Sequence, residues 1–435
     1  MQKRAWLLLL IVCGVARAQT PPPSTTDEIP APPPAPVLSP DEQKALEKAL
    51  GADAAAQSKQ TPTISAANPQ SATVPAATTS TNPLVRAFQS LKPDIAAILD
   101  FAGGYYSNPD RTLKNGDDPQ DTAINIQEVE IALQAVVDPY FRADLFLTIP
   151  NLKGIEVEEA YLTTTSLPAS LQFKVGIFRA PFGRQNTQHL HLQDFTRRPA
   201  MNALFLGADG LRSPGLEVSW LAPVPFYLLI TGAAFSVSPT DDPTAPPQSF
   251  GGGERKDFTY LGNVKTFTSL SDTTSLLFGL SFATGNSFTR LAPLAPGGSD
   301  VIESHRSFLY GADLYVKWKP VNVSQTWMSL AWTTEFMLRH LPEIGTVDGG
   351  LYSQLVWQAD RRWFIGLRGE VDGIPQDALV VRQYAGSASL TWALSEFARI
   401  RLYGEVRYQP SNTLLTEAAF LQFEAAIGAH GAHPY

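Results

Sequence analysis

The segment Ile124–Val137, INIQEVEIALQAVV, alternates between apolar and polar residues along most of its length. One face carries the apolar positions Val129, Ile131, Leu133, Ala135 and Val137. The other face carries Glu128, Glu130, Ala132 and Gln134. Because successive side chains of a β-strand point to opposite sides, this pattern predicts a strand with one apolar and one polar face. Transmembrane β-barrels have this period, with apolar residues towards lipid and polar residues towards the lumen.

Similar segments recur through the chain, and we count about sixteen of them. Their expected starts lie near residues 94, 124, 141, 155, 171, 214, 226, 256, 275, 307, 327, 349, 362, 381, 398 and 418. Short turns are expected near 138–140, 166–169, 222–225, 269–274, 320–326, 359–361 and 394–397, and most other connections are longer. An even strand number with alternating short and long connections is typical of bacterial barrels, whose short turns face the periplasm. The predicted fold class is therefore all-β, a transmembrane antiparallel up-and-down β-barrel.

The positions of aromatic residues favour this barrel over a soluble β-sandwich, which would also alternate. Four of the expected short turns are flanked by aromatic pairs: Trp220 with Phe226, Trp318 with Trp327, Trp357 with Trp363, and Trp392 with Phe397. Amphipathic rings favour the membrane interface, and membrane barrels collect them in girdles. A soluble sandwich has no physical reason to place tryptophan beside its short turns.

The start of the chain has the features of a secretory signal peptide over residues 1–18. A basic beginning is followed by the apolar run Ala5–Val12 and by a small-x-small cleavage site before Gln19. The chain's one cysteine, Cys13, lies in this segment. A mature chain without cysteine has no disulfide framework, no cysteine nucleophile and no thiolate metal site.

Residues 19–88 are rich in Pro, Ala, Ser and Thr, a composition that predicts a periplasmic linker. A capping pattern beginning at Ser39 and ending at Gly51 predicts one short helix within it. Residues 89–435 then form the predicted outer-membrane barrel. The chain has 41 acidic against 33 basic residues, which argues against a nucleic-acid partner. Expected partners are the lipid bilayer, the outer-membrane assembly machinery and small solutes or ions, and the barrel could assemble as a homotrimer.

Five segments of the barrel region resemble the phosphate-selective porin O and P superfamily. They are LKPDIAAILDF at Leu91–Phe101, EVEEAYL at Glu156–Leu162, FKVGIFRAPFG at Phe173–Gly183, HLHLQDF at His189–Phe195 and the ending GAHGAHPY. One branch of this superfamily often carries the label zinc-regulated TonB-dependent outer membrane receptor. The resemblance implies a porin-like barrel. A receptor of that kind resembles a barrel of about 22 strands filled by a folded plug, and the linker here is too short and polar for such a plug.

The longest expected connection, residues 180–213, is the candidate functional element. It follows the fifth strand, the position at which general porins fold a loop inward to narrow the pore. Charged rings at a constriction set ion selectivity. We therefore predict a constriction that includes Arg184, Asp194, Arg197 and Arg198. The alternative is an exposed loop whose charges only cover the surface.

The predicted lumen-facing positions carry both signs of charge. They include Lys174, Glu128, Glu130, Arg368, Arg399 and Arg401. Phosphate-selective relatives imply a basic ladder, and this lining is not one-sided. Salt bridges that brace the wall are the alternative role for these residues.

The same loop contains a candidate metal site. His189 and His191 are two residues apart, so both point the same way in an extended backbone. Together with Asp194 they could offer two nitrogens and one oxygen to Zn²⁺. His430 and His433 form a second pair near the C-terminus. The alternative is a loop that carries these residues without metal, and no other cofactor is expected.

The predicted function is that of an outer-membrane porin-like channel for passive diffusion of ions or small polar solutes, gated or narrowed by the 180–213 loop. We expect no enzymatic activity. Three alternatives remain open: a zinc-linked outer-membrane uptake protein or receptor, an outer-membrane hydrolase barrel, and a structural barrel plugged by its loops. A hydrolase would need a histidine at the rim of the lumen, for which His305 and His340 are candidates.

Overall fold

A computed structural model of the chain describes residues 93–109, 112–237, 249–251, 256–291, 301–321, 327–376 and 379–428. The predicted signal peptide, the linker 19–88 with its helix from Ser39 to Gly51, and the pair His430 and His433 lie outside the described residues. No helix among the described residues is long and apolar enough to cross a membrane.

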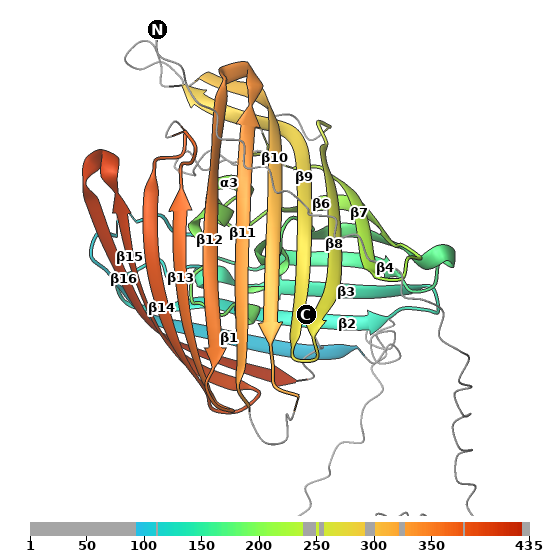
Figure 1. Cartoon of the computed structure of the whole chain (residues 1–435), viewed down its shortest axis with the longest axis horizontal. Helices are drawn as coiled ribbons and strands as arrows, with labels where there is room; N and C mark the ends of the chain where they lie inside the picture. Colours follow the sequence, from blue (N-terminus) through green and yellow to red (C-terminus); the bar gives the residue numbers. More distant parts are fainter. Residues whose placement is uncertain are drawn as a thin grey trace, which may run out of the picture. The chain divides into compact units, whose positions relative to one another are not determined.

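Sixteen antiparallel strands form the wall (Figure 1). They are β1 (Asp94–Tyr106), β2 (Ile124–Val136), β3 (Phe141–Thr148), β4 (Glu156–Thr164), β5 (Leu171–Arg179), β6 (Arg212–Leu221), β7 (Tyr227–Phe235), β8 (Thr259–Ser271), β9 (Thr274–Leu291), β10 (Val301–Trp318), β11 (Ser329–Leu341), β12 (Thr346–Gln358), β13 (Trp363–Asp372), β14 (Gln383–Ala393), β15 (Ala398–Gln409) and β16 (Leu414–Gly428). The described helix is α3 (Ala200–Leu206), and the short 3-10 turns are η1 (Pro150–Leu152), η2 (Pro168–Ser170), η3 (Gln185–Thr187), η4 (Leu190–Leu192), η5 (Pro342–Ile344) and η6 (Pro410–Asn412).

Each strand pairs with its neighbours in sequence, and β1 closes the barrel against β16. This last pairing runs from Ala96 opposite Gly428 to Tyr106 opposite Ala418. Figure 1 shows the blue first strand beside the red last one. The predicted fold class and strand number are confirmed. The largest difference between a predicted and an observed strand start is at β10, which was expected to begin near residue 307 and begins at Val301. Closure leaves no free strand edge, which is what a strand-built wall requires in lipid.

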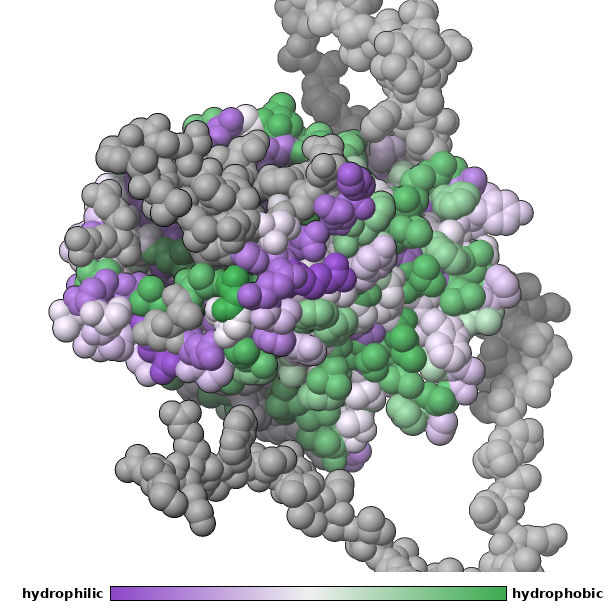
Figure 2. Space-filling model, turned by 90° about the horizontal axis from the view of Figure 1, so that it is seen from above, coloured by the Kyte–Doolittle hydropathy of each residue, from purple (hydrophilic) through white to green (hydrophobic). Residues whose placement is uncertain are grey.

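The distribution of exposed residues is inverted relative to a soluble protein. On β13, Trp363 and Leu367 are 42% and 58% exposed, whereas the charged residues Arg368 and Glu370 are only 4% and 7% exposed. The alternation in the sequence therefore places apolar side chains on the outer surface and charges inside. Seen from above, Figure 2 shows hydrophilic residues gathered across the middle of the molecule and hydrophobic residues to one side.

Two β-bulges in the first four strands interrupt this alternation. One extra residue stands in β2 at Gln127 and one in β4 at Glu158. A bulge re-aims the side chains next to it. As a result, Gln127 and Glu128 are both buried, and so are Glu158 and Glu159. Glu156 and Glu158 therefore differ in environment: the side chain of Glu156 is 48% exposed beside Arg212, and that of Glu158 is 3% exposed.

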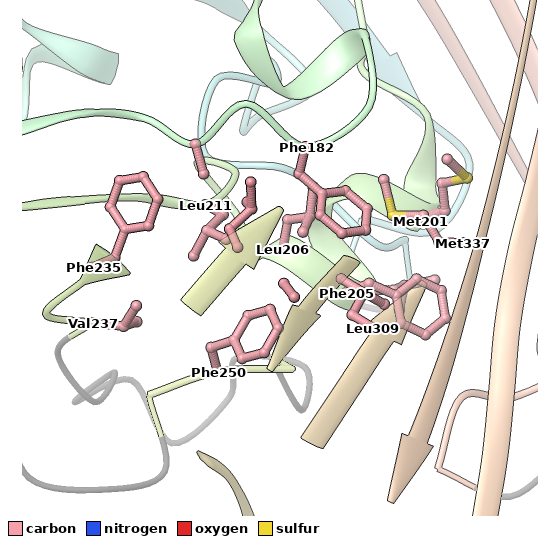
Figure 3. Close-up of a cluster of buried hydrophobic side chains, with 14 of the residues drawn as sticks. Phe182, Met201, Phe205, Leu206, Leu211, Phe235, Val237, Phe250, Leu309 and Met337 are labelled. Atoms are coloured by element: carbon pink, nitrogen blue, oxygen red, sulfur yellow. The ribbon is translucent and has the colours of Figure 1, made fainter. Parts of the chain in front are cut away.

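An apolar core fills part of the interior (Figure 3). It joins Phe182, Met201 and Phe205 of the segment between β5 and β6 to Phe235 of β7, Leu309 of β10 and Met337 of β11. In Figure 3 these side chains point towards one another from the loop and from the strands. The helix α3 accordingly lies against β11, β12 and β13. One side of the lumen is therefore occupied by packed side chains and not by water.

Candidate functional site

The segment between β5 and β6 lies inside the barrel, and we call residues 180–211 the inner loop. Its two ends meet, because the backbone N–H of Ala180 donates to the carbonyl of Leu211 at 2.8 Å. Between these ends the chain forms η3, η4 and α3. Every residue of α3 is buried. A seven-residue helix has little stability alone, so packing against the wall holds it.

Hydrogen bonds anchor the inner loop to strands on several sides of the barrel. They join Gly183 N to Ser281 Oγ of β9 (3.0 Å), Gln185 N to Glu335 Oε1 of β11 (2.7 Å), Ala200 N to Glu370 Oε2 of β13 (2.9 Å), Arg197 Nη1 to Glu405 Oε1 of β15 (2.8 Å) and Thr196 Oγ1 to Gln422 Oε1 of β16 (3.0 Å). A loop with partners on β9 and on β16 must extend across the lumen. This geometry matches an inward-folded loop and not one spread over the outer surface.

Arg197 and Arg198 do not present uncompensated charges to the lumen. The guanidinium of Arg197 lies 2.8 Å from both Asp118 and Glu405, and that of Arg198 lies 2.8 Å from Asp117. Their side chains are 3% and 1% exposed. The predicted constriction includes both arginines, and in the structure the carboxylates of Asp117, Asp118 and Glu405 neutralise them. These arginines instead join the inner loop to the loop between β1 and β2.

The other two predicted constriction residues keep contact with solvent. Asp194 is exposed and Arg184 is half-buried. The guanidinium of Arg184 lies over the ring of Tyr315 on β10, 3.9 Å from its centroid. The carboxylate of Asp194 accepts a hydrogen bond of 3.3 Å from Gln354 on β12. The half-buried Lys317 of β10 lies near both charges and near the exposed Lys319. The accessible cations in this part of the lumen, among them Arg184, Lys317 and Lys319, thus outnumber the anion Asp194.

The predicted lumen residues take part in an ion-pair network. Lys174 lies 3.6 Å from Glu217, Arg368 lies 2.8 Å from Glu370, Arg399 lies 2.6 Å from Glu424, and Arg401 donates to Gln422 at 2.8 Å. Arg401 also donates to the carbonyl of Gln193 in the inner loop at 2.7 Å. These contacts match the wall-bracing alternative, because most of the charge is compensated in pairs.

Sequence reasoning missed three interior residues that contact the inner loop or its ends. Glu335 accepts from the backbone N–H groups of Arg184 and Gln185. Arg179, at the end of β5, pairs with Glu158. Glu159 faces inward beside them and is buried. Alternation along β11 could have identified Glu335, whereas the bulge conceals the orientation of Glu159.

His189 lies among three buried carboxylates of β2 and β4. Its Nδ1 is 3.1 Å from Glu158 Oε2 and 3.4 Å from Glu130 Oε2, and its Nε2 is 3.1 Å from Glu159 Oε2. His191 Nδ1 lies 3.2 Å from the same oxygen of Glu130. Burial disfavours a charged imidazole, but the charges of Glu158 and Glu130 and their hydrogen bonds raise the pKa of His189 well above its usual value.

This arrangement changes the ligand set that the sequence suggested. His189 and His191 do lie together, with ring centroids 5.7 Å apart. The carboxylate of Asp194 is hydrogen-bonded to Gln354, and the carboxylate oxygens beside His189 that could serve as ligands belong to Glu130 and Glu158. Spacing along the loop could not reveal this, since both glutamates belong to distant strands.

The two histidines considered for a hydrolase occupy separate contacts. His305 Nδ1 lies 3.4 Å from Glu343 Oε2 at η5, and the ring of His340 lies 6.3 Å from that of Phe308. These contacts assign them no catalytic role, and the hydrolase alternative stays a prediction.

Comparison with solved structures shows a shared fold with two outer-membrane porins. Over 77% of this chain, the high-pH structure of OprB from Pseudomonas putida has a TM-score of 0.53 at 11% identity, covering 94% of that chain. The anion-selective porin from Comamonas acidovorans has a TM-score of 0.50 at 10% identity, covering 99% of that chain. The closed wall with its apolar outside and inward-folded loop thus defines a transmembrane β-barrel of porin architecture.

Comparison of sequences gives the family. No family model matches the chain. An uncharacterised protein of Aquifex aeolicus is 34% identical over 387 residues, which cover 79% of this chain and 80% of that protein. The chain belongs to the same family as this Aquifex protein.

Proposed function

We propose that the protein is an outer-membrane channel through which ions or small polar solutes diffuse passively, narrowed by the inner loop. The observation that carries the proposal is the path of this loop, which crosses the lumen and bonds to β9 and β16. A segment inside a barrel limits the cross-section through which a solute can pass. The expected location is the outer membrane, with the linker 19–88 in the periplasm.

The accessible charges near the inner loop set the expected selectivity. Arg184 and Lys317 outnumber Asp194, and paired residues contribute little net field. We therefore expect a weak preference for anions. Phosphate selectivity is not part of this proposal, because no one-sided basic lining among the described strands supports it.

Planar-bilayer recordings of the refolded full chain test the proposal. Discrete conductance steps are expected, with a reversal potential displaced towards anions at low salt. Arg184→Gln should move it towards cations, and the shift should shrink near 1 M salt, where the screening length is about 3 Å. Arg362→Gln is the matched control, since Arg362 is an exposed arginine outside the lumen, at the short turn between β12 and β13.

Correctly folded protein that gives no conductance would contradict the channel and support the structural barrel plugged by its loops. Conductance with identical reversal potentials in Arg184→Gln and wild type would reject Arg184 as a constriction residue while keeping the pore. The phosphate-selective superfamily and its zinc-linked receptor branch remain predictions from the five resembling segments.

A further inference from the structure

A compact group of ionisable side chains lies where the inner loop meets β2 and β4. Glu130, Glu158 and His189 are all buried, and each offers one ligand atom within 4.8 Å of the others. Glu159 contacts the far side of the same imidazole, with 3.1 Å between its Oε2 and His189 Nε2. The three protein segments that meet here are far apart in the sequence.

The hydrogen-bonding capacity of His189 requires a positive charge at this point. A neutral imidazole has one N–H donor and one nitrogen lone pair. If Nε2–H donates to Glu159, the lone pair of Nδ1 faces Glu158 at 3.1 Å and Glu130 at 3.4 Å. Two carboxylates against a lone pair repel each other unless a cation lies between them. A proton on Nδ1 or a metal ion can meet this requirement.

Charge balance favours the ion with two positive charges. Arg179 pairs with Glu158 and so neutralises that carboxylate. Glu130 and Glu159 then face His189, and its imidazolium supplies only one positive charge for both. His191 beside Glu130 could supply a second charge only as another buried imidazolium, with its ring centroid 5.7 Å from that of the first. Glu130 is 0% exposed, and its Oε1 accepts no hydrogen bond from any described residue. Burying a carboxylate whose charge is not fully compensated costs free energy of folding. A divalent cation would reduce this cost.

We propose that Glu130, Glu158 and His189 form a binding site for one divalent transition-metal cation of the Zn²⁺ type. His189 coordinates through Nδ1, and its Nε2–H donates to Glu159. Such a carboxylate behind a ligating histidine fixes the ring orientation and increases its basicity. A mixed set of imidazole and carboxylate suits Zn²⁺, whereas Mg²⁺ and Ca²⁺ prefer sites built from oxygen alone. His191 Nδ1 lies 3.2 Å from Glu130 Oε2 and helps to position this carboxylate.

This inference does not depend on the proposed channel. The bound ion would join the inner loop to two strands of the wall, whether or not solutes pass. Its test therefore uses metal-binding and spectroscopic measurements and does not use conductance measurements. A barrel that binds Zn²⁺ without conducting would refute the channel and leave the metal site intact.

The test uses the refolded full chain in detergent, stripped of metal with a chelator and dialysed against Zn²⁺ in the presence of excess Mg²⁺. Elemental analysis of wild type should give one Zn²⁺ per protein chain, and excess Mg²⁺ should not displace it. Glu130→Gln keeps the size of the side chain and removes one anionic ligand, so zinc affinity should fall by about tenfold or more. His340→Gln, the control, removes a histidine outside the cluster and should bind as wild type does.

Folding of each variant is checked by its mobility on unheated gels. Wild type provides a second readout that does not depend on variants, because Co²⁺ in the same site should give visible absorption bands that Zn²⁺ abolishes. No stoichiometric Zn²⁺ in folded wild type overturns the proposal. Equal affinity in wild type and folded Glu130→Gln also overturns it, since the ion would then bind elsewhere, for example at exposed histidines.

Discussion

Arg197 shows how a single side chain can connect parts of the chain that are far apart. It contacts Asp118 in the loop between β1 and β2 and Glu405 on β15, while its carbonyl accepts from Arg368 at 2.9 Å. Removal of one member of a buried ion pair leaves an uncompensated charge, which typically costs about 3–5 kcal/mol. Buried arginines of this kind stabilise the position of the inner loop.

Arg197→Met should therefore lower the free energy of unfolding by about 3–5 kcal/mol, because Asp118 and Glu405 lose their shared cation. Urea unfolding followed by tryptophan fluorescence would measure this difference. Arg362→Met should leave stability within about 0.5 kcal/mol of wild type, as for other exposed positions. Equal midpoints for the two variants would show that the ion pairs contribute nothing to stability.

Gly176 on β5 occupies a conformation that other residues rarely adopt, with φ of +141°. A Cβ built there would lie 2.1 Å from the carbonyl oxygen of Ala160 on β4. We expect Gly176→Ala to destabilise the barrel by at least about 1–3 kcal/mol. In Gly404→Ala, the matched control, a Cβ meets nothing within 4 Å. If both variants lose the folded band at the same temperature on heated gels, a side chain at position 176 causes no strain.

At the scale of elements, the inner loop is an insertion whose ends are already joined. Arg179 lies opposite Arg212 at the end of the pairing between β5 and β6, and Ala180 bonds to Leu211. A two-residue turn could therefore replace most of the loop without disturbing either strand. Because the loop forms one wall of the apolar core, its removal would also open that side of the lumen to water.

Replacing residues 182–209 by Asn-Gly should raise single-channel conductance, since the loop occupies the cross-section of the lumen. Bilayer recordings beside wild type measure the change. As a control, the exposed turn Pro410–Asn412 between β15 and β16 is replaced with three glycines, which should leave conductance as it is in wild type. Unchanged conductance after loop removal, in protein that still migrates as folded, would contradict the constriction.

The strands were predictable from the sequence because alternation is a local signal, as in Ile124–Val136. The bulge at Glu158 was not, since one extra residue leaves no mark in composition. The charged residues of the loop were identifiable, but their partners were not. Glu335 lies 151 residues from Arg184, and Glu405 lies 208 residues from Arg197. Whether a cation is accessible or neutralised depends on such distant partners, which no local pattern encodes.

At the scale of the whole molecule, closure between β1 and β16 determines whether the wall exists. Leu421 lies opposite Gly103 in this pairing and opposite Leu402 on β15. Proline lacks the N–H that a strand interior needs. Leu421→Pro should abolish the fast-migrating folded band of unheated samples, and Leu421→Ala should keep it. A folded band in the proline variant would mean that the closing pair is dispensable.

The inner loop has a consequence for the order of assembly. Its partners include Glu130 on β2 and Gln422 on β16, and closure brings the two strands together, with Gln422 donating to Gln127 on β2 at 3.1 Å. The full set of loop contacts can therefore form only after closure, and these contacts join residues at long sequence separations. A barrel with a shifted register would present the wrong side chains to the loop and leave buried charges unmatched. Only the correctly closed wall therefore gains the stability that the docked inner loop provides.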